Sequence, residues 1–331
     1  MLPPDALPPG VPSLRQALQR LHHPPPDASL AALSDHADPA WQRLKFEELL
    51  AQQLSQHDAR RERAQLKAPA LHGTSGGLRD RLHAALPFTL TAAQQRVVRE
   101  IAADLSQPKP MHRLLQGDVG SGKTVVAALA AALAIESGWQ CALMAPTEIL
   151  AEQHFRKLVQ WLTPLDVGMA WLTGSRKGRS RNEMVARVGS GEASLVIGTH
   201  AVIQDDVRFA RLGLAIVDEQ HRFGVQQRLQ LRRKLALQGL EPHLLMMSAT
   251  PIPRTLAMTY YADLDVSTLD ELPPGRRSVT TKLLSGQRRH EVLSRIRQAC
   301  AEGEQAYWVC PVIEESKAGL RTALETFETL Q

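Results

Sequence analysis

The stretch LLQGDVGSGKTVVAALAAALAIESG, residues 114–138, decides the fold class of this chain. Within it, Gly117–Thr124 follow the pattern G-x-x-x-x-G-K-[ST], whose glycines let backbone N–H groups turn inward around phosphate oxygens. The apolar pair Leu114–Leu115 precedes the pattern and an alanine-rich run follows it. An ordinary Gly/Ser loop is the alternative interpretation, but a strand, a loop and a helix in this order favour a phosphate-binding loop.

The apolar run after Thr124 raises a second alternative, a membrane segment. Its longest uninterrupted part, Val125–Ile135, is shorter than the ~20 residues that a membrane-spanning helix needs. A helix that is apolar on nearly all sides is typical of burial against a sheet. The proline-rich N-terminus shows no signal-peptide pattern. We therefore expect no membrane partner and a cytoplasmic protein.

The composition is that of a globular protein, with 44% hydrophobic and 22% charged residues. The formal net charge of +5 is compatible with a polyanionic partner but does not by itself indicate one. The cysteines Cys141, Cys300 and Cys310 are scattered and odd in number, which argues against a disulfide framework or a zinc site. We expect them to be small buried hydrophobic side chains in a reducing compartment.

Four short apolar runs downstream of the loop have the length of strands and end in polar residues. They lie at Cys141–Pro146, Leu195–Thr199, Leu214–Glu219 and Leu244–Thr250. Longer helical stretches separate them, which is typical of a parallel α/β sheet. Such sheets bind ligands at the carboxyl ends of their strands, where all four runs carry their polar residues.

The two ends of the chain differ from this region. Nine prolines in the first 40 residues predict an extended connector, and Asp38–Pro39 predicts the start of a helix. The segment ELPPGRR, Glu271–Arg277, predicts a linker. Beyond it we expect the first β-α-β of a second unit, with strands at 280–285 and 306–313 around a helix at 288–301.

A pair of carboxylates follows one of the predicted strands, in the sequence Asp218-Glu219-Gln220-His221. A lone Asp-Glu pair is usually a solvated turn, but here an apolar strand precedes it and a phosphate loop lies upstream. We expect Asp218 to bind Mg²⁺ and Glu219 to position and deprotonate the attacking water. Lys123 would reach the β- and γ-phosphates, and the Thr124 hydroxyl would also hold Mg²⁺.

The chain carries three motifs in a fixed order: the phosphate loop, then DEQH, then SATPIPRT (Ser248–Thr255). This order resembles that of the motifs of superfamily-two helicases and translocases. Further segments narrow the resemblance to the RecG family of ATP-dependent DNA helicases, which remodel stalled replication forks and branched recombination intermediates. These segments are LPFTLTAAQ (Leu86–Gln94), APTEILAEQH (Ala145–His154), DEQHRFGVQQR (Asp218–Arg228), LDELPPGR (Leu269–Arg276) and YWVCPVIEES (Tyr307–Ser316).

The resemblance implies an α/β fold: a RecA-like P-loop motor domain with a parallel sheet flanked by helices. A helical, proline-rich connector would precede this domain and the start of a second RecA-like domain would follow. It implies ATP and Mg²⁺ as cofactors and branched or duplex DNA as the partner, in repair and recombination at the nucleoid. Other replication and repair proteins are further candidate partners.

The resemblance also implies roles for individual residues. Gln94 would hydrogen-bond the adenine edge beside Phe88, since an amide offers a donor and an acceptor together. The residues that the family uses to hold the phosphates correspond to Gly117, Gly120, Ser121, Gly122, Lys123 and Thr124. Ser248, Ala249 and Thr250 would couple the nucleotide site to DNA movement.

Contacts to DNA phosphates are expected from Thr147, Thr199, Arg222 and Arg228. The two arginines lie in an acid-free stretch, Gln220–Leu240, and a second basic stretch spans Ser175–Arg187. Charge clusters are most often solvated faces, so each basic residue is a weak candidate alone. Aromatic residues make up only 4% of the chain, which suits a motor that follows the duplex backbone without stacking on bases.

The resemblance predicts four segments. Residues 1–37 would be the exit of the family's N-terminal wedge domain, and 38–85 a connecting helix and linker. Residues 86–272 would form the ATP-binding domain, and 273–331 a linker with an incomplete second motor domain. Because family members hydrolyse ATP between two motor domains, we expect this chain alone to bind nucleotide weakly and to hydrolyse it poorly.

Three alternatives are considered. The motor of a transcription-repair coupling factor shares similar loop and HRFGV motifs, but LDELPPGR, YWVCPVIEES and the helix from Trp41 to Leu54 favour RecG. A non-catalytic nucleotide- and DNA-binding module remains open. The third alternative, a metabolic P-loop kinase, is not supported. Such an enzyme does not need the SATP motif after DEQH or the acid-free arginine stretches that this chain has.

Overall fold

A computed structural model describes residues 10–175, 178–219, 239–249, 264–271, 280–310 and residue 327. The chain divides into two compact units, residues 1–275 and 276–331. The segment limits expected at residues 38, 86 and 273 stay predictions.

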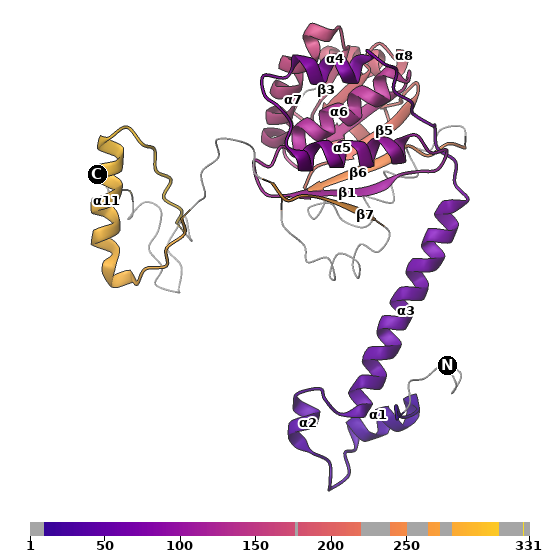
Figure 1. The fold of residues 1–331 in the computed structure, drawn as a ribbon, viewed down its shortest axis with the longest axis vertical. Coiled ribbons are helices and arrows are strands. Elements are labelled where there is room, and N and C mark those ends of the chain that lie inside the picture. Colours follow the sequence, from indigo (N-terminus) through magenta and orange to yellow (C-terminus); the bar gives the residue numbers. More distant parts are fainter. Residues whose placement is uncertain are drawn as a thin grey trace. The chain divides into compact units, whose positions relative to one another are not determined.

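The first unit contains a seven-stranded sheet in which every pair of neighbouring strands is parallel (Figure 1). The strand order is β3-β4-β2-β5-β6-β1-β7. In chain order the strands are β1 (His112–Gly117), β2 (Gln140–Met144), β3 (Met169–Leu172), β4 (Leu195–Gly198), β5 (Leu212–Val217), β6 (His243–Ser248) and β7 (Asp265–Leu269). The parallel α/β sheet predicted from the sequence is therefore confirmed.

Four of the seven strands, β2, β4, β5 and β6, lie where the sequence predicts strands, and β1 contains the apolar pair Leu114–Leu115 noted before the loop. The strands β3 and β7, which no sequence pattern predicted, form the edges of the sheet. In β7 the side chains alternate between exposed and buried over part of its length, so it lacks the continuous apolar run that marks the central strands.

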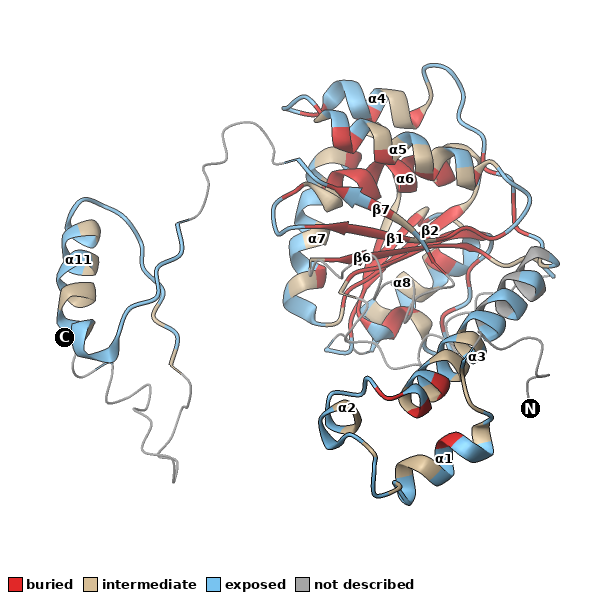
Figure 2. Ribbon diagram, turned by 60° about the horizontal axis from the view of Figure 1, so that its bottom comes forward, coloured by how far each residue is buried: buried red, intermediate tan, exposed pale blue. Residues whose placement is uncertain are grey.

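Helices cover both faces of the sheet (Figure 2). One face packs against α5 (Ala92–Leu105), α6 (Lys123–Glu136) and α7 (Glu148–Leu162), and α4 (Leu78–Ala85) packs on α6. The other face packs against α8 (Arg179–Ser190). Two short 3-10 turns, η2 (Thr163–Leu165) and η3 (His200–Ile203), complete this part of the unit.

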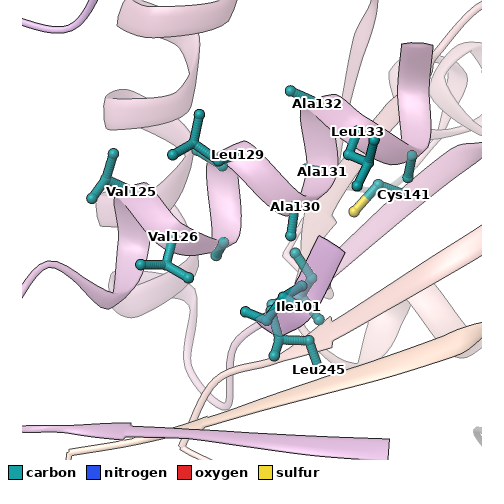
Figure 3. Packing of buried hydrophobic residues seen from close by; sticks show 14 of the residues in the cluster. Ile101, Val125, Val126, Leu129, Ala130, Ala131, Ala132, Leu133, Cys141 and Leu245 are labelled. Atoms are coloured by element: carbon teal, nitrogen blue, oxygen red, sulfur yellow. The ribbon is translucent and has the colours of Figure 1, made fainter. Parts of the chain in front are cut away.

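Helix α6, which follows the glycine-rich loop, lies in the middle of the core. Every residue from Val125 to Ala134 is buried, and the run packs against strand and helix residues such as Ile101, Cys141 and Leu245 (Figure 3). This confirms that the apolar run is a buried helix. Across the described ranges, no helix combines the length and the apolar character that a membrane crossing requires.

Two helices, α1 (Leu14–His22) and α2 (Leu30–Ser34), lie where the sequence predicts an extended connector. Helix α3 (Pro39–Ala64) follows them. Ser13 and Gln16 form a reciprocal capping box at the start of α1, which stabilises a helix despite the surrounding prolines. The helix start at Pro39 is confirmed: the Asp38 carboxylate accepts from the Ala40 N–H, and this bond, with Arg20 alongside, lowers the pKa of Asp38.

In the second unit the structure describes η5 (Gly286–Arg288) and α11 (Arg289–Ala301), which confirms the predicted helix. The strand predicted at 280–285 is wrong, and residues 304–310 form no strand either; 311–313 lie outside the described residues. Leu283, Tyr307 and Val309 are almost fully exposed, so these segments bury no apolar face. Strands without hydrogen-bonded neighbours and a buried face are not stable in water.

The three cysteines are free, and Cys141 is buried in β2 as predicted, where burial raises the pKa of its thiol. Cys300 is exposed, so the expectation of a buried hydrophobic side chain is wrong at this position. Its helix, α11, has no buried residue, which explains the exposure.

Candidate nucleotide-binding site

The glycine-rich loop connects the carboxyl end of β1 to the N-terminus of α6, as the sequence predicts. Gly120 and Gly122 have φ angles of 79° and 90°, in the left-handed region that favours glycine. A Cβ atom on Gly117 would lie 2.6 Å from the Ser121 Oγ, and one on Gly122 would lie 2.2 Å from the Gln94 Nε2. The loop therefore needs glycine for its backbone conformation and for its close packing.

The Lys123 side chain folds back along this loop. Its Nζ donates to the carbonyl oxygens of Gly117, at 2.7 Å, and Asp118, at 3.0 Å. These bonds keep the ammonium group within the loop, where the N-terminus of α6 adds its own positive end. The loop is therefore an electropositive cradle suited to phosphate groups.

A cavity of about 660 Å³ opens beside the loop, within the size range of small-molecule sites. The sequence-predicted residues in its wall are Phe88, Gln94, Gly120, Gly122, Lys123 and Thr124, together with Asp218, Glu219 and Ala249. These residues come from distant parts of the chain and were predicted to form one site. The structure places them in the wall of one cavity.

Asp218 and Glu219 stand directly after β5. The Asp218 N–H donates to the Met144 carbonyl oxygen of the neighbouring strand β2 at 2.8 Å, and its Oδ1 accepts from the Glu219 N–H at 3.0 Å. Glu219 has a φ of 50°, an unfavourable left-handed conformation for a residue with a side chain. Such strain is concentrated at functional sites.

Gln94 and Phe88 lie in the cavity wall with protein partners of their own. The Gln94 Oε1 accepts from the Thr91 N–H at 3.0 Å, and its Nε2 donates to the Ser121 carbonyl oxygen at 2.8 Å. The Phe88 ring meets the Trp161 ring edge-on, with centroids 6.1 Å apart. The adenine contacts expected of Gln94 and Phe88 stay predictions. The Gln94 Oε1 can accept one more hydrogen bond and its Nε2 can donate one more, so the amide can still bond a ligand.

Helix α7 supplies a wall of the cavity that sequence reasoning missed. Its lining residues Leu150, Gln153, His154, Lys157 and Trp161 share one face of the helix. The His154 Nε2 lies 2.7 Å from the Asp218 Oδ2. The helical spacing of these residues after Thr147 could have shown from the sequence that they share one face of a helix. The contact between His154 and Asp218 could not be predicted in this way, because the two residues are 64 positions apart in the chain.

Thr124 and Asp218 offer the hydroxyl and carboxylate oxygens that Mg²⁺ prefers. Among the described residues, no group of three or more His, Cys, Asp or Glu side chains could hold a metal ion alone. Two oxygen ligands from the protein, those of Thr124 and Asp218, fit Mg²⁺, because proteins usually bind this ion through one or two carboxylates together with waters and substrate phosphates.

The remaining predicted residues are distributed as follows. Ser248 is buried at the end of β6, and Ala249 follows it in the cavity wall. The Thr147 hydroxyl caps α7 by accepting from the Leu150 N–H at 3.3 Å. Thr199 is buried at the end of β4, and its Oγ1 has no hydrogen-bond partner. Thr250, Arg222 and Arg228 lie outside the described residues.

The basic stretch at Ser175–Arg187 is paired with acidic groups as far as it is described. Arg181 binds Asp206 at 2.7 Å and Arg187 binds Glu192 at 2.7 Å. Arg179 is almost fully exposed beside Glu183. Arg176 and Lys177 lie outside the described residues.

Comparison with known proteins identifies the family. Residues 91–259, about half of the chain, match the model of the DEAD/DEAH box helicases. The chain belongs to the DEAD/DEAH box helicase family. The parallel sheet with helices on both faces is the RecA-like fold of these helicases, and the family uses ATP.

Several DEAD/DEAH box helicases are similar over most of this chain. The ATP-dependent DNA helicase RecG of Pasteurella multocida (strain Pm70) is 55% identical over 307 residues, which cover 92% of this chain and 44% of the relative. RecG of Escherichia coli (strain K12) is 51% identical over 333 residues, covering 100% of this chain and 48% of the relative.

A solved structure of RecG bound to a three-way DNA junction has a TM-score of 0.75 and 40% sequence identity. The match covers 91% of this chain and 40% of that one. The present DEAD/DEAH box chain thus spans less than half of the length of the relatives it matches.

Proposed function

We propose that this chain is the ATP-binding motor half of a RecG-type DNA helicase, which uses ATP hydrolysis to remodel branched DNA in repair and recombination. Residues 86–272 would form the ATP-binding domain. The observation that carries the proposal is the meeting of Lys123 with Asp218 and Glu219 in one cavity. Similarity to RecG supports DNA, and branched DNA in particular, as the partner.

The phosphate end of the site is supported by the geometry of the loop. The Lys123 Nζ is held by two carbonyl oxygens, and phosphate oxygens of ATP would replace them as acceptors. The backbone N–H groups of the loop would donate to the same phosphates. Binding would therefore exchange bonds in which only the ammonium donor is charged for bonds in which the donor and the phosphate acceptor are both charged.

The hydrolytic end is supported by the carboxylates after β5. Thr124 and Asp218 would hold Mg²⁺, which neutralises the charge that develops on the transferred phosphoryl group. Glu219 would accept a proton from the attacking water and orient it. Its position in the same cavity supports this role, because a general base must come within hydrogen-bond reach of its substrate.

The test compares the wild-type chain with Lys123→Ala, in binding of a fluorescent ATP analogue and in ATP turnover with and without forked DNA. We expect Lys123→Ala to weaken nucleotide binding and abolish any turnover. Equal binding and turnover in the two proteins would refute the proposed site. Lys123-dependent binding without turnover would favour the non-catalytic nucleotide-binding module.

A further inference from the structure

His154 makes one close contact to a carboxylate of the proposed site. Its Nε2 lies 2.7 Å from the Asp218 Oδ2, and the two side chains are only 11% and 10% exposed. An ionised carboxylate has no hydrogen to donate, so the Nε2 of His154 carries the proton and donates it. The contact is therefore a short, charge-assisted hydrogen bond shielded from water.

Both oxygens of the Asp218 carboxylate are held in this way. Oδ2 accepts from His154 and Oδ1 accepts from the Glu219 N–H. The two donors come from different elements, α7 and the turn after β5, so the carboxylate has little freedom to rotate. Each carboxylate oxygen can accept a further bond, which leaves lone pairs for a cation.

The helix that carries His154 is itself firmly placed. Leu158 and Leu162, on α7, are fully buried in the core, and the Thr147 hydroxyl caps its N-terminus. A side chain on such an element holds its partner more accurately than one on a loop does.

We infer that His154 is a positioning residue for the magnesium–nucleotide site and acts by fixing the carboxylate of Asp218. The inference rests on the proposed function, because it assigns the Asp218 carboxylate to Mg²⁺. The competing explanation is purely structural: the bond would only fasten α7 to the end of β5. Loss of a group that orients a metal ligand typically weakens metal affinity about 10–100-fold.

The experiment uses the full chain and a fluorescent ADP analogue, with binding measured in EDTA and across a Mg²⁺ titration. The variants are His154→Phe, which removes the donor, and His154→Gln, whose amide N–H restores one. In His154→Phe we expect the Mg²⁺ concentration at half-saturation to rise about 10–100-fold. Binding in EDTA should change much less than the Mg²⁺ half-saturation point does, and His154→Gln should recover part of the Mg²⁺ affinity.

Arg156→Ala is the matched control, because Arg156 lies on the same helix with an exposed side chain. A double-mutant comparison uses Asp218→Asn. In a chain that already carries Asp218→Asn, adding His154→Phe should cause no further change in the Mg²⁺ titration. Urea unfolding of every variant accounts for any general loss of fold. An equal loss of binding with and without Mg²⁺, or no shift in His154→Phe, would overturn the inference. Failure of the wild-type chain to bind the analogue would instead count against the proposed function.

Discussion

The side-chain amide of Gln94 joins the start of α5 to the phosphate loop. Its Nε2 donates to the Ser121 carbonyl oxygen at 2.8 Å, and its Oε1 accepts from the Thr91 N–H at 3.0 Å. Thr91 in turn accepts from the Gln94 N–H, which completes a capping box. One buried side chain therefore fixes a helix terminus and the loop that is proposed to bind phosphate.

This double role predicts different outcomes for two substitutions of Gln94. Gln94→Ala removes both bonds and should lower the free energy of unfolding by about 1–3 kcal/mol. Gln94→Glu keeps an acceptor for Thr91 but places a carboxylate against the Ser121 carbonyl oxygen. Its nucleotide affinity should therefore fall even where its α5 cap is retained. Urea unfolding and binding of a fluorescent nucleotide measure the two effects, and equal affinity in Gln94→Glu and wild type would contradict this account.

From the backbone conformation of Glu219 we predict that its replacement by glycine raises the stability of the chain and removes its activity. Its φ of 50° is strained for a side-chain-bearing residue and relaxed for glycine. Glu219→Gly should raise the free energy of unfolding by up to about 1 kcal/mol and abolish ATP hydrolysis. Glu219→Gln keeps the strain, so it should lose hydrolysis without gaining stability. A Glu219→Gly chain that is less stable than Glu219→Gln would contradict the prediction.

His243 predicts an acid-sensitive step in stability. The buried ring accepts from the Met111 N–H at its Nδ1 and donates to the Pro69 carbonyl oxygen from its Nε2. Burial lowers the pKa of His243 below its ordinary value, although the bond to Pro69 opposes the shift. The unfolded chain, with a histidine pKa of about 6.5, therefore binds more protons than the folded chain just below that pH. Stability is complete above pH ~6.5 and falls as the pH drops from there toward the folded-state pKa.

The variant His243→Asn isolates this contribution, because asparagine does not titrate and can keep an acceptor near the position of Nδ1. It should be less stable than wild type at pH 7.5, by about 1–3 kcal/mol, since the Pro69 oxygen loses its donor. The difference should narrow as the pH is lowered to 5.5, measured by urea unfolding at each pH. A difference that stays constant with pH would show that His243 does not titrate in this window.

Sequence patterns located the centre of this fold well because its central strands and α6 are buried on all sides. A buried strand must be an apolar run, and the carboxyl end of that run places residues such as Asp218. The edge strand β7 escaped prediction because only part of it is buried. Helix α1 escaped because a local capping box outweighed the surrounding prolines.

Contacts between distant segments were beyond sequence reasoning. The bond from His154 to Asp218 depends on how α7 packs against the sheet, which no local pattern records. The two protein partners of Gln94 were likewise unforeseen, because the motif indicated a ligand contact and said nothing of the loop carbonyl. A motif thus identifies which residues meet, while packing determines how each of them is held.

The hydroxyl of Thr199 is buried without a hydrogen-bond partner, and Thr199 is only 3% exposed. A buried unsatisfied polar group costs about 1–3 kcal/mol, so the fold itself does not benefit from it. Thr199→Val keeps the shape of the side chain and should leave the free energy of unfolding unchanged or raise it by up to that amount. If Thr199 contacts a DNA phosphate, as the resemblance implies, the same change should weaken DNA binding.

Thr147→Val is the comparison for stability, because the Thr147 hydroxyl caps α7 and its loss should cost about 1 kcal/mol. Its DNA affinity tests the other threonine that the resemblance assigns to DNA phosphates. Fluorescence anisotropy with labelled forked DNA, at one fixed salt concentration, measures the affinity of both variants. A stable Thr199→Val chain with weakened DNA binding would mean that the hydroxyl serves the ligand, since the fold does not need it. A destabilised Thr199→Val chain that binds DNA as tightly as wild type would remove Thr199 from the DNA interface.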